Sequence, residues 1–167
     1  LGIERAALRG WLRKRRLPFR DDPSNASLAF DRNRVRHLIV PALAKALNPA
    51  AARHLVEAAA RLREDAALLD ALARERFETA ATRRGGHLVL GAEALAVLPH
   101  PLAARVARMA LEAAGCDRRR ISSRHIEALV GLATAARGSS IDLPGRLVSR
   151  RRGRLLEFRP CDSPATS

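Results

Sequence analysis

Residues 48–86 read NPAAARHLVEAAARLREDAALLDALARERFETAATRRGG and form the longest stretch of the chain with a helical repeat. Every seventh residue in the first part of this stretch is a leucine, at Leu55, Leu62 and Leu69. Asn48 is a suitable N-cap and two glycines end the repeat, so we predict one helix over about residues 50–83. Such a helix is roughly 50 Å long at 1.5 Å per residue. Because alanine fills most of the heptad seam, we expect the helix to pack against other helices rather than to form a coiled coil.

Shorter patterns flank this stretch on both sides. Apolar residues recur with helical spacing at residues 3–16, 30–38, 102–114 and 123–136. Towards the C-terminus the apolar residues alternate, which is typical of strands. We expect strands at residues 87–90, 140–143, 146–149 and 154–158, with turns at 144–145 and 151–153. The predicted fold class is mainly α: a helical domain with a long central helix and a small antiparallel β element near the C-terminus.

The charge of the chain points to a polyanionic partner. Among its 167 residues, 31 Lys and Arg face 17 Asp and Glu, which gives a formal net charge of +14. All the basic residues except Lys14 and Lys45 are arginines, whose planar guanidinium can bind a phosphate with two hydrogen bonds. A GC-rich genome would favour arginine, but it does not account for the shortage of acids. A phosphate backbone is therefore the expected ligand.

Composition also excludes several classes of protein. Aromatic residues make up 3% of the chain and tyrosine is absent, which argues against an RNA-binding platform of stacked aromatic rings. The two cysteines are too few for a disulfide framework or a zinc cage. The sequence has no run of 18 apolar residues and no secretion signal, so we expect a cytoplasmic protein with no membrane partner.

The sequence contains no motif that completes a catalytic site. A glycine-rich phosphate loop, a helical His-Glu-x-x-His pair and a Gly-x-Ser-x-Gly elbow are all missing, so we predict neither catalytic nor metal-binding residues in this chain. Cys116 precedes three arginines that could lower its pKa, but a lone thiol without a placed histidine is more simply structural. One alternative function is a stand-alone basic helical module for DNA or ribosomal RNA. The helices at 102–114 and 123–136 could form a helix-turn-helix, although their connection is longer than the usual turn.

The most distinctive motif lies at residues 18–41. It reads PFRDDPSN at 18–25 and FDRNRVRH at 30–37, and it closes with Pro41. This pattern resembles the D-P-S-N … R-N-x-(I/V)-R … P signature of the tRNA(Ile)-lysidine synthetase family. The order of the weaker motifs downstream is also similar to that family: Leu62-Arg63-Glu64-Asp65, Leu98-Pro99 and Ile141-Asp142-Leu143-Pro144-Gly145.

This resemblance implies a definite reaction and a division of labour. Members of the family adenylate the C2 oxygen of the wobble cytidine in an isoleucine tRNA with ATP, and free L-lysine then displaces AMP to give lysidine. ATP and Mg²⁺ bind to an N-terminal domain with a Ser-Gly-Gly-x-Asp-Ser loop, which this sequence lacks. We therefore expect residues 1–48 to be the end of that domain with linker helices, 49–160 a helical tRNA-handling domain and 161–167 a frayed tail. Such a segment would be inactive alone, and whether it forms a homodimer stays open.

Three groups of residues are the predicted tRNA-binding residues. The first follows from the motif and comprises Asp22, Asn25, Arg32, Asn33 and Arg36. The others are two arginine triplets, Arg118, Arg119, Arg120 and Arg150, Arg151, Arg152. In the alternative interpretation, residues 22–25 are only a capping turn, Arg32 pairs with a neighbouring acid and the triplets are solvated surface.

Overall fold

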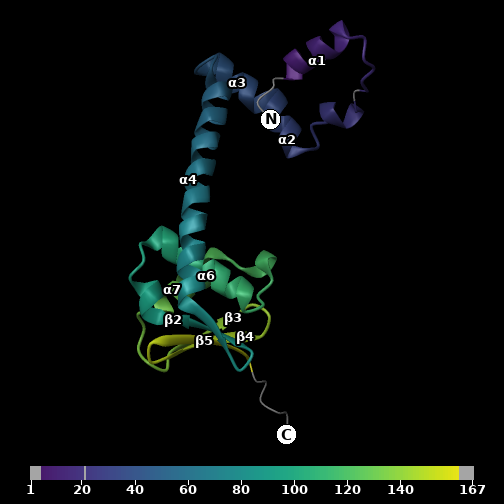
Figure 1. The fold of residues 1–167 in the computed structure, drawn as a ribbon. Helices are drawn as coiled ribbons and strands as arrows, with labels where there is room; N and C mark the ends of the chain where they lie inside the picture. Colours follow the sequence, from purple (N-terminus) through teal and green to yellow (C-terminus); the bar gives the residue numbers. More distant parts are fainter. Residues whose placement is uncertain (1–4, 21, 162–167) are drawn as a thin grey trace. The chain divides into compact units, whose positions relative to one another are not determined.

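The computed structural model describes residues 5–20 and 22–161. The chain separates into two compact units, one up to residue 59 and one from residue 60 (Figure 1). The boundary falls inside the long helix α4 (Ala51–Ala80), which confirms the predicted central helix. The Ala50 N–H donates a hydrogen bond of 2.8 Å to Asn48 Oδ1 just before this helix, as expected of an N-cap. The predicted tail falls almost wholly on residues 162–167, which lie outside the described residues.

The first unit consists of short helices. Its elements are α1 (Arg5–Lys14), the 3₁₀ turn η1 (Pro23–Ala26), α2 (Asp31–Arg34), the π-helical turn η2 (Val35–Ile39) and α3 (Val40–Ala46). The helix predicted at 3–16 is α1, although its first residues lie outside the described ones. A π turn occurs where a ladder of helical hydrogen bonds is widened, and here it ends at Ile39, two residues before Pro41. Proline has no N–H for the ladder, so regular helical hydrogen bonding is interrupted near Pro41.

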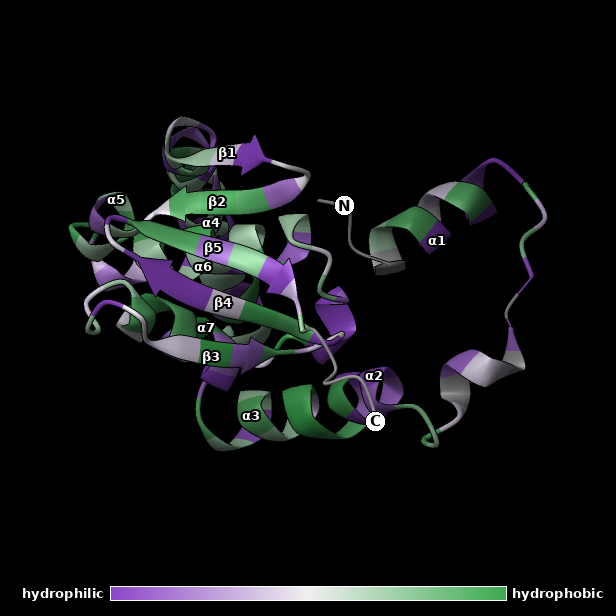
Figure 2. Ribbon diagram, turned by 90° about the horizontal axis from the view of Figure 1, so that it is seen from below, coloured by the Kyte–Doolittle hydropathy of each residue, from purple (hydrophilic) through white to green (hydrophobic). Residues whose placement is uncertain are grey.

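The second unit contains a five-stranded antiparallel sheet with the strand order β1-β2-β5-β4-β3. The strands are β1 (Ala81–Arg84), β2 (His87–Gly91), β3 (Ser140–Leu143), β4 (Leu147–Arg152) and β5 (Leu155–Pro160). Between β2 and β3 come α5 (Ala92–Ala96), α6 (His100–Ala113), the 3₁₀ turn η3 (Arg118–Arg120) and α7 (Ser123–Leu132). The helices lie on one face of the sheet (Figure 2). The small antiparallel β element near the C-terminus is thus confirmed.

The core of the second unit lies between the sheet and these helices. The largest fully buried apolar side chains are Leu90, Leu95, Val106, Leu111, Leu129 and Leu156. Alternation along each strand sends Leu90 and Leu156, which are partners in the β2–β5 ladder, to the helix-covered face. The neighbouring residues along each strand, such as Val89 and Glu157, point to the opposite face.

Three sequence expectations need correction. Leu55 and Leu62 are 53% and 68% exposed, so the expected packing of α4 along its heptad is wrong at these positions. Only the last turns of α4 join the core, through buried Ala73 and half-buried Phe77. The helix also stops three residues earlier than predicted, because residues 81–84 pair with β2 as a strand. The turn predicted at 151–153 begins later, since β4 continues to Arg152 and Gly153 supplies the positive φ of 63°.

Candidate functional site

Residues 22–27 form a tight turn that its first residue caps. Asp22 Oδ1 accepts a hydrogen bond of 2.9 Å from the Ser24 N–H, and Asp22 O accepts one of 3.0 Å from the Asn25 N–H. A further bond of 3.2 Å runs from the Ser27 N–H to Ser24 O. Asp and Asn side chains favour such turns because they can bond to nearby backbone groups. Asp22 therefore has a structural partner within the turn.

Helix α2 and the turn η2 hold this turn through two side chains. Asn33 is fully buried, and its Nδ2 donates hydrogen bonds of 2.8 Å to both Ser24 O and Ser27 O. One helical turn later, His37 Nε2 lies 3.1 Å from Asn25 O, which makes Nε2 the donor because a carbonyl oxygen only accepts. The two halves of the sequence motif are thereby joined into one structure, which we call the motif site, residues 22–37.

Two exposed arginines of the motif site form no ion pair with a described residue. The Arg32 guanidinium lies 5.2 Å from the centroid of the Phe30 ring, a distance at which the cation is attracted to the ring face. Arg36 lies on η2, also exposed. The neighbouring acid Asp31 pairs with Arg34, and no carboxylate among the described residues forms an ion pair with Arg32 or Arg36. Both guanidiniums are therefore available to an anionic ligand.

The charge of Asp22 is stabilised by its surroundings. The pKa of its carboxyl is lowered, mainly because the backbone N–H of Ser24 donates to it, and the Ser24 side chain adds to this effect. The positive charge of Arg32 acts in the same direction. The turn is thus held by a carboxylate that stays ionised at neutral pH.

The triplet Arg118, Arg119 and Arg120 forms η3 and is exposed. Asp117 caps this turn, since its Oδ1 accepts a hydrogen bond of 2.9 Å from the Arg119 N–H. Arg118 Nε lies 3.6 Å from Glu112 Oε1, whereas Arg119 and Arg120 have no ion pair with any described residue. Burial raises the pKa of the adjacent Cys116 thiol, so the nearby arginines do not make it a reactive thiolate.

The triplet Arg150, Arg151 and Arg152 is divided by the alternation of β4. Arg151 points to the helix-covered side, where its guanidinium donates to Ala135 O and, at 3.3 Å, to Gly153 O. Arg150 and Arg152 lie on the other face, in a groove of about 380 Å³ that Arg159 and Glu157 also line. We call this the sheet groove.

One carboxylate of the sheet groove, that of Glu157, pairs with two guanidiniums. Glu157 Oε2 lies 3.1 Å from Arg159 Nη2 and 3.4 Å from Arg152 Nε, and its side chain is only 19% exposed. Arg150 is the cross-strand partner of Glu157 but forms no ion pair with a described residue. The sheet groove thus presents three guanidiniums and two carboxylates, since Asp142 also lines it.

The sequence prediction missed His37 and Arg159. His37 could have been found, because it follows Asn33 by four residues on a predicted helix and so shares its face. Arg159 could be found only from the strand register, which pairs it with Val148. In the folded sheet, Arg159 and Arg152 both pair with Glu157. Among the described residues, no cluster of three or more His, Cys, Asp or Glu could hold a metal ion. None of the described helices is both long and apolar enough to span a membrane.

Two family models match separate parts of the sequence. Residues 1–43 match the model described as PP-loop domain, and residues 90–156 match the model described as TilS substrate binding domain. The motif site lies in the first match. The second match contains β3 and β4 and parts of β2 and β5.

Curated relatives match the chain along most of its length. The tRNA(Ile)-lysidine synthase of Streptomyces coelicolor is 37% identical over 160 residues, which cover 95% of this chain and 45% of the relative. The enzymes of the same name from Solibacter usitatus and Thermobifida fusca are 35% and 39% identical and cover 89% and 78% of this chain. The chain spans from about a third to about half the length of the relatives it matches, between 32% and 52%. The resemblance to the tRNA(Ile)-lysidine synthetases is thus confirmed.

Proposed function

We infer that this chain, a relative of one part of the tRNA(Ile)-lysidine synthases, is the tRNA-handling region of an ATP-dependent ligase. The ligase converts the wobble cytidine of an isoleucine tRNA to lysidine. We assign ATP, Mg²⁺ and L-lysine to the PP-loop domain, of which residues 1–43 match a part. We assign no catalytic residue to this chain, whose own residues bind and position the tRNA.

The observation that carries this proposal is the motif site. Asn33 and His37 hold the turn at 22–27 against the helix, and the same helix presents Arg32 and Arg36 to solvent. We propose that these two arginines bind phosphates of the tRNA near the reacting cytidine. Asp22 and Asn33 through their side chains, and Asn25 through its backbone carbonyl, then act as positioning residues that fix the direction of the arginine-bearing helix.

The second unit supplies further basic surface for the body of the tRNA. We assign this role to the exposed triplet of η3 and to Arg150 and Arg152 of the sheet groove. Arg151 donates to the backbone of its own unit, so we assign it a structural role instead. The surplus of 14 positive charges makes binding depend strongly on salt, because bound phosphates release their counterions.

Binding of an isoleucine tRNA transcript at several salt concentrations tests this proposal. If about six phosphates are neutralised, the logarithm of the association constant falls with the logarithm of salt with a slope of about −4 to −5. A tenfold excess of duplex DNA or ribosomal RNA serves as competitor. Equal competition by these polyanions would favour the stand-alone nucleic-acid module, and absent or salt-independent binding of tRNA would contradict the proposal.

A pair of variants in a full-length enzyme tests the role of the motif site. Arg36→Gln should lower the rate of lysidine formation about tenfold or more without changing the melting temperature, because it removes one charged contact with the tRNA. Arg34→Gln is the matched control, since Arg34 lies on the same helix but pairs with Asp31. Equal rates for the two variants would remove Arg36 from the proposed interface.

We also propose that the protein acts in the cytoplasm, where its tRNA substrate is found. Whether two copies associate is a separate question, and sedimentation of the free chain and of its tRNA complex would answer it.

A further inference from the structure

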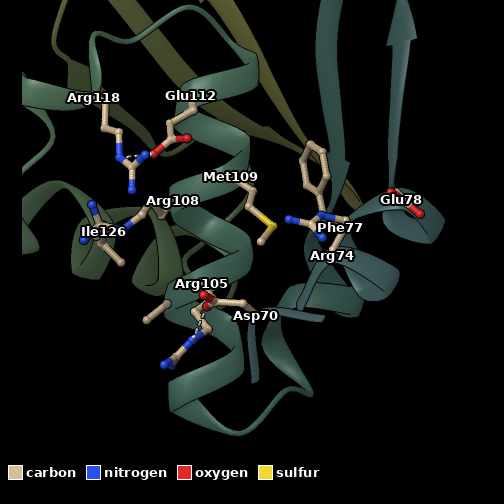
Figure 3. Close-up of a pocket in the computed structure, with 11 residues that line it drawn as sticks. Asp70, Arg74, Phe77, Glu78, Arg105, Arg108, Met109, Glu112, Arg118 and Ile126 are labelled. Atoms are coloured by element: carbon tan, nitrogen blue, oxygen red, sulfur yellow. Dashed lines mark hydrogen bonds and ion pairs between the residues drawn. The ribbon is translucent and has the colours of Figure 1, made fainter. Parts of the chain in front are cut away.

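A second groove of the sheet-containing unit lies apart from the sheet groove. Its volume is about 800 Å³, and it is bounded by the last turns of α4, one side of α6 and the turn η3 (Figure 3). This volume is in the range of sites that enclose a small molecule. Only Arg118 among its lining residues belongs to the predicted tRNA-binding set. We call it the helix groove.

Two ion pairs fix acids that line the helix groove. Arg105 Nε lies 2.8 Å from Asp70 Oδ1 and its Nη1 donates to Pro101 O at 3.0 Å, so this pair ties α6 to α4. Arg118 Nε and Glu112 Oε1, 3.6 Å apart, tie η3 to α6. Two carboxylates of the helix groove are therefore already balanced by guanidiniums.

Two further arginines face the helix groove without such partners. Arg74 of α4 and Arg108 of α6 are exposed, and neither forms an ion pair or side-chain hydrogen bond with another described residue. The remaining acid, Glu78, lies well away from Arg108 in Figure 3. These two guanidiniums can therefore bind an anion that enters the groove.

An apolar surface lies beside these arginines. Phe77 and Met109 are half-buried against the core, and Met109 points from α6 towards the part of α4 that carries Phe77 and Arg74 (Figure 3). A cationic groove with an apolar, partly aromatic surface matches a nucleotide, whose phosphate is anionic and whose base has a flat π face. A paired base in a duplex hides that face in the stack, so the groove suits an unpaired base.

We propose that the helix groove binds an unpaired nucleotide of the RNA substrate. Arg74 and Arg108 hold its phosphate, and the base rests on Phe77 and Met109. The proposal rests on the proposed function, because it takes RNA as the ligand, and it adds a site and a class of RNA element to it.

The test compares a single-stranded RNA oligonucleotide with an RNA duplex of the same length, each titrated with the 167-residue chain. The double variant Arg74→Gln/Arg108→Gln should weaken single-strand binding about tenfold and reduce the salt slope by about 1 to 2 units, as expected for two lost phosphate contacts. Arg63→Gln/Arg76→Gln is the matched control, because it removes the same charge from exposed positions of α4 outside the groove. The two double variants should weaken duplex binding by the same factor, because they remove the same charge.

A second variant tests the surface for the base. Met109→Gln keeps the side-chain length but adds a polar group, so it should weaken single-strand binding severalfold without changing the salt slope. Circular-dichroism melting checks that the variant is folded, and Met109→Leu, which stays apolar, should retain the wild-type affinity.

Each result has a distinct meaning. Equal loss of single-strand binding in the groove and control double variants, with a binding wild type, overturns the helix-groove inference and leaves the proposed function standing. An equal loss for duplex and single strand in the groove variant overturns the assignment to an unpaired nucleotide. If the wild-type chain binds no RNA, the tRNA-handling function itself is wrong.

Discussion

Asn33 donates both of its amide hydrogens to backbone carbonyls of the turn that precedes its helix, at 2.8 Å each. It is the one buried side chain that the structure describes up to residue 59. Large apolar residues of the same unit, such as Trp11 and Leu38, are about half exposed. At the scale of the residue, a buried amide rather than an apolar core therefore holds the motif site together.

Replacing Asn33 should release the turn. Asn33→Asp keeps the shape but places an acceptor against two carbonyl oxygens, so we expect a loss of about 2 kcal/mol or more in local stability. Hydrogen exchange at residues 24–34 measures this loss directly. Asn25→Ala is the control, because the Asn25 side chain makes no hydrogen bond among the described residues. Unchanged protection in Asn33→Asp would show that the two bonds do not order the turn.

The turn should also loosen in acid. The pKa of Asp22 is lowered in the folded chain, so ionised Asp22 stabilises the turn above its ordinary pKa of about 3.9, and this contribution is lost as the pH falls through the lower folded value. Chemical shifts of the Ser24 amide, followed from pH 7 to pH 2, report the change. Asp22→Asn retains a capping group without a titrating charge, so its Ser24 amide should stay ordered in acid. Loss of order at the same pH in both proteins would assign the transition to another carboxyl.

The three consecutive arginines of β4, Arg150 to Arg152, have different surroundings, because successive side chains of a strand point to opposite faces of the sheet. Arg151 reaches Ala135 O beyond the end of α7, whereas Arg152 pairs with Glu157 at 3.4 Å on the open face. A run of like charges in the sequence is thus divided at the scale of the element into a structural residue and two surface residues.

Arg151→Gln should therefore destabilise the fold more than Arg150→Gln. The first variant removes charge-assisted hydrogen bonds to two backbone carbonyls and should cost about 1–3 kcal/mol in urea unfolding. Arg150 has no ion pair among the described residues, so its variant should lower RNA affinity while leaving the unfolding midpoint unchanged. Equal midpoints for the two variants would show that the Arg151 bonds add nothing to stability.

At the scale of the whole molecule, the two units differ in how much apolar surface they bury. The unit from residue 60 has a sheet, helices over one face and a core of leucines, alanines and Phe158. The unit up to residue 59 exposes aromatic and aliphatic side chains that such a core would bury. Exposed arginines occur in both units, in the motif site, the sheet groove and the helix groove, so we expect a long polyanion to contact surfaces in each.

From the sequence alone came the class of fold, which the structure confirms, and the proposal of a polyanionic partner. Helical spacing, a cap at Asn48 and a surplus of arginine act locally or add up along the chain, so they can be read without coordinates. The tertiary structure decided which arginines remain available. Arg151 and Arg105 are engaged by carbonyls and a carboxylate that are distant in sequence, whereas Arg74 and Arg108 are brought into one groove from two helices. Strand β1 likewise depended on β2, because a short segment after a long helix becomes a strand only when a neighbour supplies its hydrogen bonds. Pairing between distant residues has no period in the sequence, and it is this pairing that separates the arginines held by the fold from those left without an ion pair.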